Sequence, residues 1–391
     1  MQKLLILTLS IFFSAVLLAD EGLFIKEDWA KAQKLAKETG KPIMVDFYTE
    51  WCGWCKVMDK KTFSDSAVQV KLKSSYISLK LDAERGIGRE VAMKYRVTGF
   101  PTFGFFSADG NLIGKISGYQ EIEPYMAALD SMQQFNVAGK NRFPGVSKEL
   151  KLNYPEIYSK SFGLNGERKF PTNEEVAQWF NENAEVKDEV YFNLLSRFFS
   201  KAPKETQNEF LENRESYSQK YGQQDIESIL YSLINNRFYK AMKAKNEQDL
   251  ITLVQDLSSY IAEDQVPRVS RQLKLSYYSS TKDFKTLTQL INTGIADGSL
   301  NNSAINNYAW DMYKGCDDKQ CLADALAWMK KVTDNEPIYM YLDTYAAIAY
   351  KLDSYKLAKE YGIQAIEAGK EEGEDYKATE ELLEKIQAEL N

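Results

Sequence analysis

Two of the four cysteines lie close together in the run WCGWCK at residues 51–56. A short apolar run precedes this pair and a helical pattern follows it, so we expect Cys52 at a helix N-terminus. The unpaired N–H groups and partial positive charge of such a terminus stabilise a thiolate. We therefore expect Cys52 to be exposed and nucleophilic, and Cys55, one turn inward, to be more buried and to resolve a mixed disulfide. Taken alone, a CxxC pair also fits half a zinc site or a structural staple.

Asp46 interrupts the apolar run at residues 42–48, six residues before Cys52. A buried carboxylate is costly, and desolvation should raise its pKa. Near the thiols, Asp46 would accept the proton of Cys55 as that thiol attacks. An aspartate on an exposed strand edge is the alternative.

A second segment expected near the cysteines is TGFPT at residues 98–102, which precedes a strand pattern. A proline that opens a strand is expected to be cis, which would turn the Phe100 backbone toward the cysteines. There the backbone would pair with an extended substrate segment. The expected substrate-binding residues are Trp51, Gly53, Trp54, Phe100 and Pro101.

The other two cysteines, Cys316 and Cys321, fall in a turn between two expected helices. We predict a structural disulfide that pins this helical hairpin, with a second redox pair, free thiols or a metal site as alternatives. A joint zinc site with Cys52 and Cys55 is not expected, because a domain boundary separates the pairs. The sequence contains no histidine, which excludes Cys-His nucleophile pairs and histidine metal sites. We expect no metal and no cofactor besides the Cys52–Cys55 disulfide.

The elements that must position these residues form an α/β domain at about residues 20–138. Strand patterns occupy residues 42–48, 76–82, 102–107 and 112–117, and helical patterns occupy 28–37, 52–61, about 83–95 and 121–135. A glycine-rich connector is expected at 139–170, and residues 171–391 show only helical patterns. Residues 308–314 and 345–351 are similar to each other, and paired helices repeating at about 34 residues resemble tetratricopeptide repeats. We therefore expect a TPR-like α-solenoid at about 302–391, and only helical hairpins before it.

Three runs carry a resemblance to a known family. VDFYTEWCGWCK at 45–56 resembles the active-site strand and helix of thioredoxins, and TGFPTFGFF at 98–106 resembles their cis-proline segment. KKTFSD at 60–65 is similar to the C-terminal thioredoxin-like domain of DsbD-type reductases. The resemblance implies a thioredoxin-like fold.

This resemblance also implies roles, with Cys52 as nucleophile, Cys55 as resolving cysteine, Asp46 as buried acid and Pro101 as cis-proline. Two positions depart from the pattern. Trp54 stands where thioredoxins carry proline, and Ser78 stands where many carry a buried lysine, although Lys80 lies on the same strand face.

The N-terminus predicts export. Lys3 precedes an apolar run at residues 4–19 that is shorter than the ~20 residues of a spanning helix. We expect a signal peptide at residues 1–19 and an extracytoplasmic location, the bacterial periplasm; an uncleaved anchor is the alternative. The net charge of −7 and the scattered Lys and Arg argue against a nucleic-acid partner.

These patterns predict an enzyme, an exported thiol–disulfide oxidoreductase acting on disulfides of extracytoplasmic proteins. Reduction is favoured over oxidation or isomerisation because of Asp46 and the DsbD-like run at 60–65, and a reductase requires a membrane electron donor. The alternative is a TPR-like scaffold that docks a protein partner, with the thioredoxin-like domain as an adaptor or a redox-sensitive chaperone.

Overall fold

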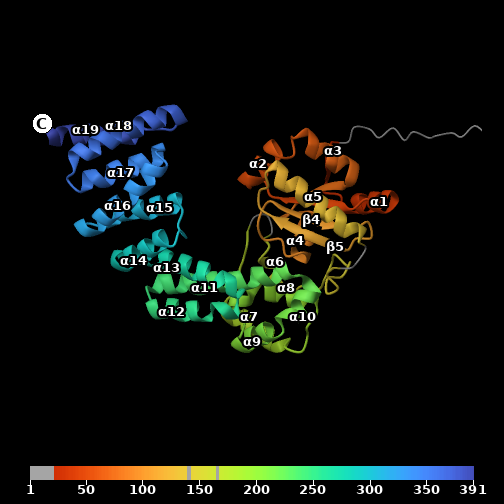
Figure 1. The fold of residues 1–391 in the computed structure, drawn as a ribbon. Coiled ribbons are helices and arrows are strands. Elements are labelled where there is room, and N and C mark those ends of the chain that lie inside the picture. Colours follow the sequence, from red (N-terminus) through yellow and green to blue (C-terminus); the bar gives the residue numbers. More distant parts are fainter. Residues whose placement is uncertain (1–21, 139–141, 164–166) are drawn as a thin grey trace, which may run out of the picture. The chain divides into compact units, whose positions relative to one another are not determined.

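The computed structural model describes residues 22–138, 142–163 and 167–391 (Figure 1). The expected signal peptide and parts of the expected connector lie outside these residues. The chain divides into two compact units, called here the N-terminal unit, which ends at Ile229, and the C-terminal unit, Leu230–Asn391. None of the helices in the described ranges combines the length and hydrophobicity needed to cross a bilayer.

A five-stranded mixed sheet forms the centre of the N-terminal unit, in the order β1-β3-β2-β4-β5. Its strands are β1 Ile25–Lys26, β2 Ile43–Tyr48, β3 Ile77–Asp82, β4 Thr102–Phe106 and β5 Leu112–Ser117. β3 runs parallel to β1 and β2, whereas β4 is antiparallel to β2 and β5. The strand patterns expected at residues 102–107 and 112–117 are confirmed as β4 and β5, which pair with each other. Because β2 is a central strand, its apolar residues are buried on both faces.

Helices cover both faces of this sheet (Figure 1). They are α1 Trp29–Thr39, α2 Gly53–Lys61, α3 Ser66–Ser75, α4 Gly86–Lys94 and α5 Ile122–Val137. Met58 of α2, Leu72 of α3 and Leu129 of α5 belong to one buried cluster. On the other face, Trp29 of α1 packs edge-on against Phe106. The predicted α/β fold class is therefore confirmed.

The sequence patterns missed α3, which follows the active-site helix directly. Its start is marked by Asp65, whose carboxylate accepts hydrogen bonds from the backbone N–H groups of Ala67 and Val68 at 2.9 and 3.0 Å. An aspartate in this position is a common N-cap. Two apolar residues, Val68 and Leu72, bury one side of the helix.

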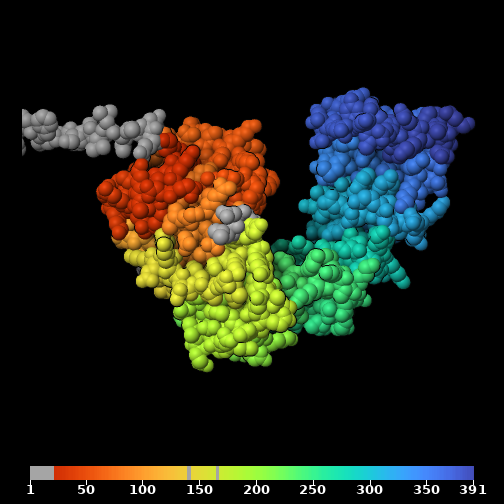
Figure 2. Space-filling model, turned by 180° about the vertical axis from the view of Figure 1, so that it is seen from behind, coloured from red at the N-terminus to blue at the C-terminus, as the bar shows by residue number. Residues whose placement is uncertain are grey.

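Further α-helices described in the N-terminal unit are α6 Glu156–Lys160, α7 Asn173–Glu182, α8 Glu189–Phe198, α9 Lys204–Glu212 and α10 Arg214–Tyr221. Figure 2 shows their surface (yellow to green) as continuous with that of the α/β domain (red to orange). Buried ion pairs hold the two parts together. Asp225, at the start of α11 Gln223–Ala244, pairs with Arg96 at 2.5 Å and with Lys115 at 2.8 Å.

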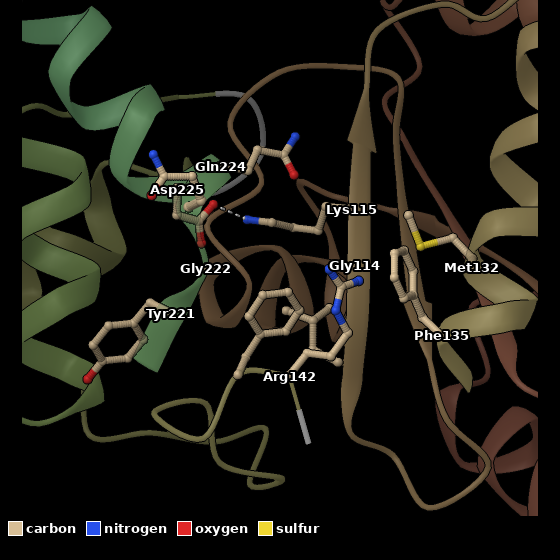
Figure 3. A pocket seen from close by; sticks show the side chains of 12 residues that line it. Gly114, Lys115, Met132, Phe135, Arg142, Tyr221, Gly222, Gln224 and Asp225 are labelled. Atoms are coloured by element: carbon tan, nitrogen blue, oxygen red, sulfur yellow. Dashed lines mark hydrogen bonds and ion pairs between the residues drawn. The ribbon is translucent and has the colours of Figure 1, made fainter. Parts of the chain in front are cut away.

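This ion-pair cluster borders a pocket of about 190 Å³. Figure 3 shows Lys115 reaching toward Asp225, with Arg142 beside Gly114 and Phe135 next to Met132. Because both charges of each pair are buried, loss of one partner would leave the other unsolvated.

The C-terminal unit is all-α, as predicted. Its further helices are α12 Glu247–Asp256, α13 Val266–Thr281, α14 Phe284–Ala296, α15 Asn302–Gly315, α16 Lys319–Asn335, α17 Tyr339–Lys351, α18 Tyr355–Glu372 and α19 Lys377–Leu390. The two similar sequence runs lie in α15 and α17, which are followed by α16 and α18.

Side chains also pair at a repeat distance in this unit. Asn302 donates to Glu336 and Lys319 to Asp353, each at 2.9 Å and each between residues 34 positions apart. This spacing supports a repeating stack of helical pairs. Assignment to the tetratricopeptide class stays a prediction.

Candidate active site

The CxxC pair lies where the sequence predicted, at the start of α2 and after β2, with Cys55 in the first turn of the helix. Cys52 is the N-cap residue of α2, and its Sγ accepts a hydrogen bond from the backbone N–H of Cys55 at 3.0 Å. The two cysteines form a disulfide, with their Cα atoms 5.3 Å apart. A helix terminus thus places its free N–H groups beside the sulfur of Cys52, as thiolate stabilisation requires.

The prediction that Cys52 is exposed is wrong for this disulfide form. Cys52 and Cys55 are both only 4 % exposed. The Cys52 sulfur is bonded to Cys55 and also caps the helix, so it points along the helix start rather than into solvent. The difference in accessibility expected between the two cysteines is absent from the oxidised pair.

Asp46 is buried, so the alternative of an exposed strand edge is excluded. It lies on central strand β2 and is 1 % exposed. Its Oδ2 pairs with Lys80 Nζ on β3 at 3.0 Å, while its Oδ1 has no hydrogen-bond partner among the described residues. Burial raises the pKa of Asp46 to about 6, although the Lys80 charge opposes that rise. The predicted direction of this shift is confirmed.

Lys80, on the neighbouring strand β3, supplies the cation next to Asp46. Its ammonium also contacts Asp59 of α2 at 2.5 Å. Burial lowers the pKa of Lys80, but the neighbouring carboxylates of Asp46 and Asp59 outweigh this effect and raise it overall. Lys80 therefore stays charged, and it links the buried acid to the active-site helix.

Exposed aromatic side chains border the cysteines. Trp51 and Trp54 are 64 % and 62 % exposed. The Trp51 ring packs edge-on against Phe100, with ring centroids 6.0 Å apart, and the Trp54 ring lies 5.5 Å from that of Tyr119. The peptide bond before Pro101 is cis, as predicted. The structure therefore brings together Trp51 and Phe100, which are far apart in sequence.

Sequence reasoning missed Glu84 and Arg168. The Trp51 indole N–H donates to one Glu84 carboxylate oxygen at 2.9 Å, and Arg168 donates to the other at 3.2 Å. Arg168 lies 84 positions from Glu84 and belongs to the expected connector. No local pattern marks this pairing, so nothing in the sequence signalled that the segment reaches the active-site rim.

Arg89 holds the same segment to the domain. It donates hydrogen bonds to the backbone carbonyl oxygens of Ser159 and Gly163. Glu50, next to Trp51 in the chain, pairs with Arg85 through two contacts of 2.7 and 3.1 Å.

The second cysteine pair belongs to the C-terminal unit. Cys316 follows α15 and Cys321 lies in the first turn of α16, and the structure joins them as a disulfide. Within the described residues, no cluster of three or more Cys, Asp or Glu side chains has an arrangement that fits a metal ion.

Comparison with known proteins identifies the α/β part of the chain. A family model described as a thioredoxin-like domain matches residues 29–133. Residues 29–133 are a thioredoxin-like domain.

The curated relatives match the same region. The thiol:disulfide interchange protein DsbD of Vibrio vulnificus (strain CMCP6) is 34 % identical over 104 residues, 26 % of this chain and 17 % of that protein. The DsbD of Yersinia pestis (strain Pestoides F) is 34 % identical over 101 residues, 25 % of this chain and 17 % of that protein. The match thus spans less than a fifth of these relatives. A Thermus thermophilus thioredoxin structure is 25 % identical, covering 30 % of this chain and 95 % of that one, with a TM-score of 0.28.

The prediction of a thioredoxin-like domain is thereby confirmed for residues 29–133. The thioredoxin-like domain contains the CxxC pair, and the relatives that match it are thiol:disulfide interchange proteins. Proteins of this type use the cysteine pair itself as the redox centre.

Proposed function

We propose that the protein is a thiol–disulfide oxidoreductase that reduces disulfides of exported proteins through Cys52 and Cys55. One observation carries the proposal: the Cys52–Cys55 disulfide caps helix α2 within a thioredoxin-like domain that also holds the buried acid Asp46. These three groups supply a nucleophile, a resolving thiol and a proton acceptor.

The reaction starts from the reduced pair. The Cys52 thiolate attacks one sulfur of the client disulfide, which breaks the client S–S bond, forms a mixed disulfide and releases one client thiolate. Cys55 then transfers its proton to Asp46 and attacks the sulfur of Cys52. The client leaves with both of its sulfurs reduced, and Cys52 and Cys55 are oxidised to a disulfide. With a pKa of about 6, Asp46 is ionised at neutral pH and ready to accept this proton.

The client segment would bind across the aromatic rim. Trp51, Trp54 and Phe100 offer ring surfaces next to the cysteines, and the backbone beside Pro101 offers hydrogen bonds to an extended chain. Gly53 lies between Cys52 and Trp54, and nothing lies within 4 Å of the place that a Cβ would occupy. A client backbone can therefore approach the disulfide closely at this point.

Reduction is the direction we propose, because an acid with a raised pKa assists the resolving step that releases a reduced client. The pair must then be recharged by a dithiol donor, which we place in the membrane. We propose an extracytoplasmic location, the bacterial periplasm, on the basis of the export signal expected at residues 1–19.

The test is an insulin-reduction assay on the full chain with dithiothreitol as electron donor. Cys52→Ser should lower the rate to that of dithiothreitol alone, because no nucleophile remains. Cys55→Ser should accumulate a mixed disulfide through Cys52. The matched control is Cys316→Ser/Cys321→Ser, which removes the other pair and should retain the wild-type rate.

Wild-type protein that does not accelerate insulin reduction would refute the enzymatic proposal. The direction is tested separately by equilibrating the Cys52–Cys55 pair with glutathione. A potential near the −270 mV of thioredoxin supports reduction, whereas one near about −120 mV, as in DsbA, reverses the direction.

A second candidate function rests on the C-terminal unit. Its helical pairs stack at a repeat distance and contain a cavity of about 440 Å³. We propose that this unit docks protein partners, either to select clients or with the thioredoxin-like domain serving as an adaptor or redox-sensitive chaperone. The pair Cys316 and Cys321 would then be a structural disulfide that holds the α15–α16 turn.

A further inference from the structure

Two contacts hold Trp51 on the active-site rim, although its side chain is largely exposed. Its ring packs edge-on against Phe100 at a centroid distance of 6.0 Å, and its indole N–H donates to Glu84 at 2.9 Å. The ring is 64 % exposed, and side chains this exposed otherwise change rotamer rapidly. The orientation of the Trp51 ring therefore depends on where the Glu84 carboxylate lies.

The Glu84 carboxylate has little access to solvent and pairs with a cation. Glu84 is 8 % exposed. One of its carboxylate oxygens accepts the Trp51 indole N–H, and the other accepts from Arg168 at 3.2 Å. Among the ion pairs of the described residues, Arg168 is the cation bound to this carboxylate. A buried carboxylate that loses its cation is driven to turn toward water, and such a turn would move the acceptor of the Trp51 N–H.

The segment that carries Arg168 to the rim is held to the N-terminal unit on both sides. Before it, Arg89 of α4 donates to the backbone carbonyl oxygen of Gly163. After it, Lys201 donates to the backbone carbonyl oxygen of Pro171 at 2.6 Å. Because this backbone is already tethered, Arg168 loses less conformational entropy when it pairs with Glu84.

Arg168 lies outside the thioredoxin-like domain, whereas Trp51 and Glu84 lie inside it. The family model ends at residue 133, and the DsbD of Vibrio vulnificus (strain CMCP6) matches 26 % of this chain. The ion pair between Arg168 and Glu84 therefore joins the expected connector to a rim that the domain builds.

We propose that Arg168 is a positioning residue for client binding. It holds the Glu84 carboxylate, which holds the Trp51 indole N–H. The Trp51 ring then stays against Phe100, as one side of the surface that receives the client. Arg168 acts through this ring and not through the sulfur atoms, so it sets client affinity and leaves the thiol chemistry unchanged. This inference rests on the proposed function, because it names a residue that shapes the same site.

The first test observes the Trp51 indole directly and requires no activity. In the full chain labelled with ¹⁵N-tryptophan, each of the six tryptophans gives one indole N–H signal, and Trp51→Phe identifies the signal of Trp51. In Arg168→Ala this signal should shift, and its exchange with water should become about fivefold faster, as expected for the loss of one hydrogen bond. The matched control, Lys169→Ala, removes the same charge one position along the segment and should leave the signal in place.

The second test separates KM from kcat in the insulin assay. Arg168→Ala should raise KM about fivefold, while kcat and the glutathione equilibrium constant of the cysteine pair change less than about twofold. Arg168→Lys should remain within about twofold of wild type, because one contact of 3.2 Å joins the two side chains and an ammonium group can replace it. In the Trp51→Phe background, which lacks the indole N–H, Arg168→Ala should have no further effect on KM.

An unchanged Trp51 indole signal in Arg168→Ala would overturn the proposal. A fall in kcat with unchanged KM would also overturn it, as would an equal rise in KM for Lys169→Ala or an undiminished effect of Arg168→Ala in the Trp51→Phe background. Failure of the proposed function gives a different result. If wild type does not accelerate insulin reduction, that function is refuted, and the indole signal alone decides whether Arg168 positions Trp51.

Discussion

Replacing Asp46 with asparagine should stabilise the thioredoxin-like domain at neutral pH while it slows the reaction. The side chain is 1 % exposed; within the part of the chain that the structure describes, one carboxylate oxygen pairs with Lys80 at 3.0 Å and the other has no partner. Asparagine is nearly the same size as aspartate and is uncharged, so the variant buries no charge at this position. The substitution therefore removes a buried charge with little change in packing.

The magnitude follows from the pKa of Asp46. Burial raises this pKa from the ordinary value of 3.8 to about 6, and each unit corresponds to about 1.4 kcal/mol, which gives about 3 kcal/mol. A raised pKa means that the fold favours the protonated acid. The contribution to stability is fully present below pH 3.8, declines as the pH rises through about 6, and is absent above that range.

The free energy of unfolding of Asp46→Asn should therefore exceed that of wild type by up to about 3 kcal/mol at pH 8, and by well under 1 kcal/mol at pH 4. This figure already includes the attraction between Asp46 and Lys80, which is one of the causes that set the pKa, and Lys80 keeps its contact with Asp59 in the variant. In the insulin assay, the variant should turn over more slowly because Cys55 loses its proton acceptor.

The assay is hydrogen exchange of the β2 and β4 backbone amides in the oxidised full chain at both pH values. It reports on the thioredoxin-like domain separately from the C-terminal unit. Asp59→Asn is the control, since Asp59 binds the same Lys80 but is about half exposed. The reasoning is refuted if these amides exchange faster in Asp46→Asn than in wild type at pH 8. It is also refuted if the stability difference between variant and wild type does not increase from pH 4 to pH 8.

Two further substitutions probe the scaffold of the N-terminal unit. Asp225→Asn should cost about 3 kcal/mol, because it leaves the buried charges of Arg96 and Lys115 without their carboxylate; urea unfolding followed by circular dichroism measures this loss. An unchanged midpoint would mean that this cluster does not hold the helical segment to the domain. Gly88→Ala should lower stability by about 2 kcal/mol or more, since the added Cβ would overlap the carbonyl oxygen of Asp82. Thermal unfolding measures this loss, and a stability equal to wild type would contradict the close packing of α4 on β3.

The sequence predicted those parts of the site that depend on neighbours in the chain. The buried strand, the helix that follows it and the positions of Cys52, Cys55 and Asp46 all follow from short-range patterns, because apolar periodicity and motif spacing act over a few residues. The cis peptide bond before Pro101 was predicted for the same reason. Helix α3 was missed, although Asp65 supplied a cap signal, because the helix buries only a narrow apolar side.

Only the tertiary structure decided which distant residues complete the site. Arg168 reaches Glu84 and hence Trp51, and Arg96 meets Asp225 across 129 positions of sequence. Such pairings depend on the path of the whole chain, which no local pattern encodes. The disulfide likewise decided the burial of Cys52, since a bonded sulfur at a helix cap faces its partner rather than solvent.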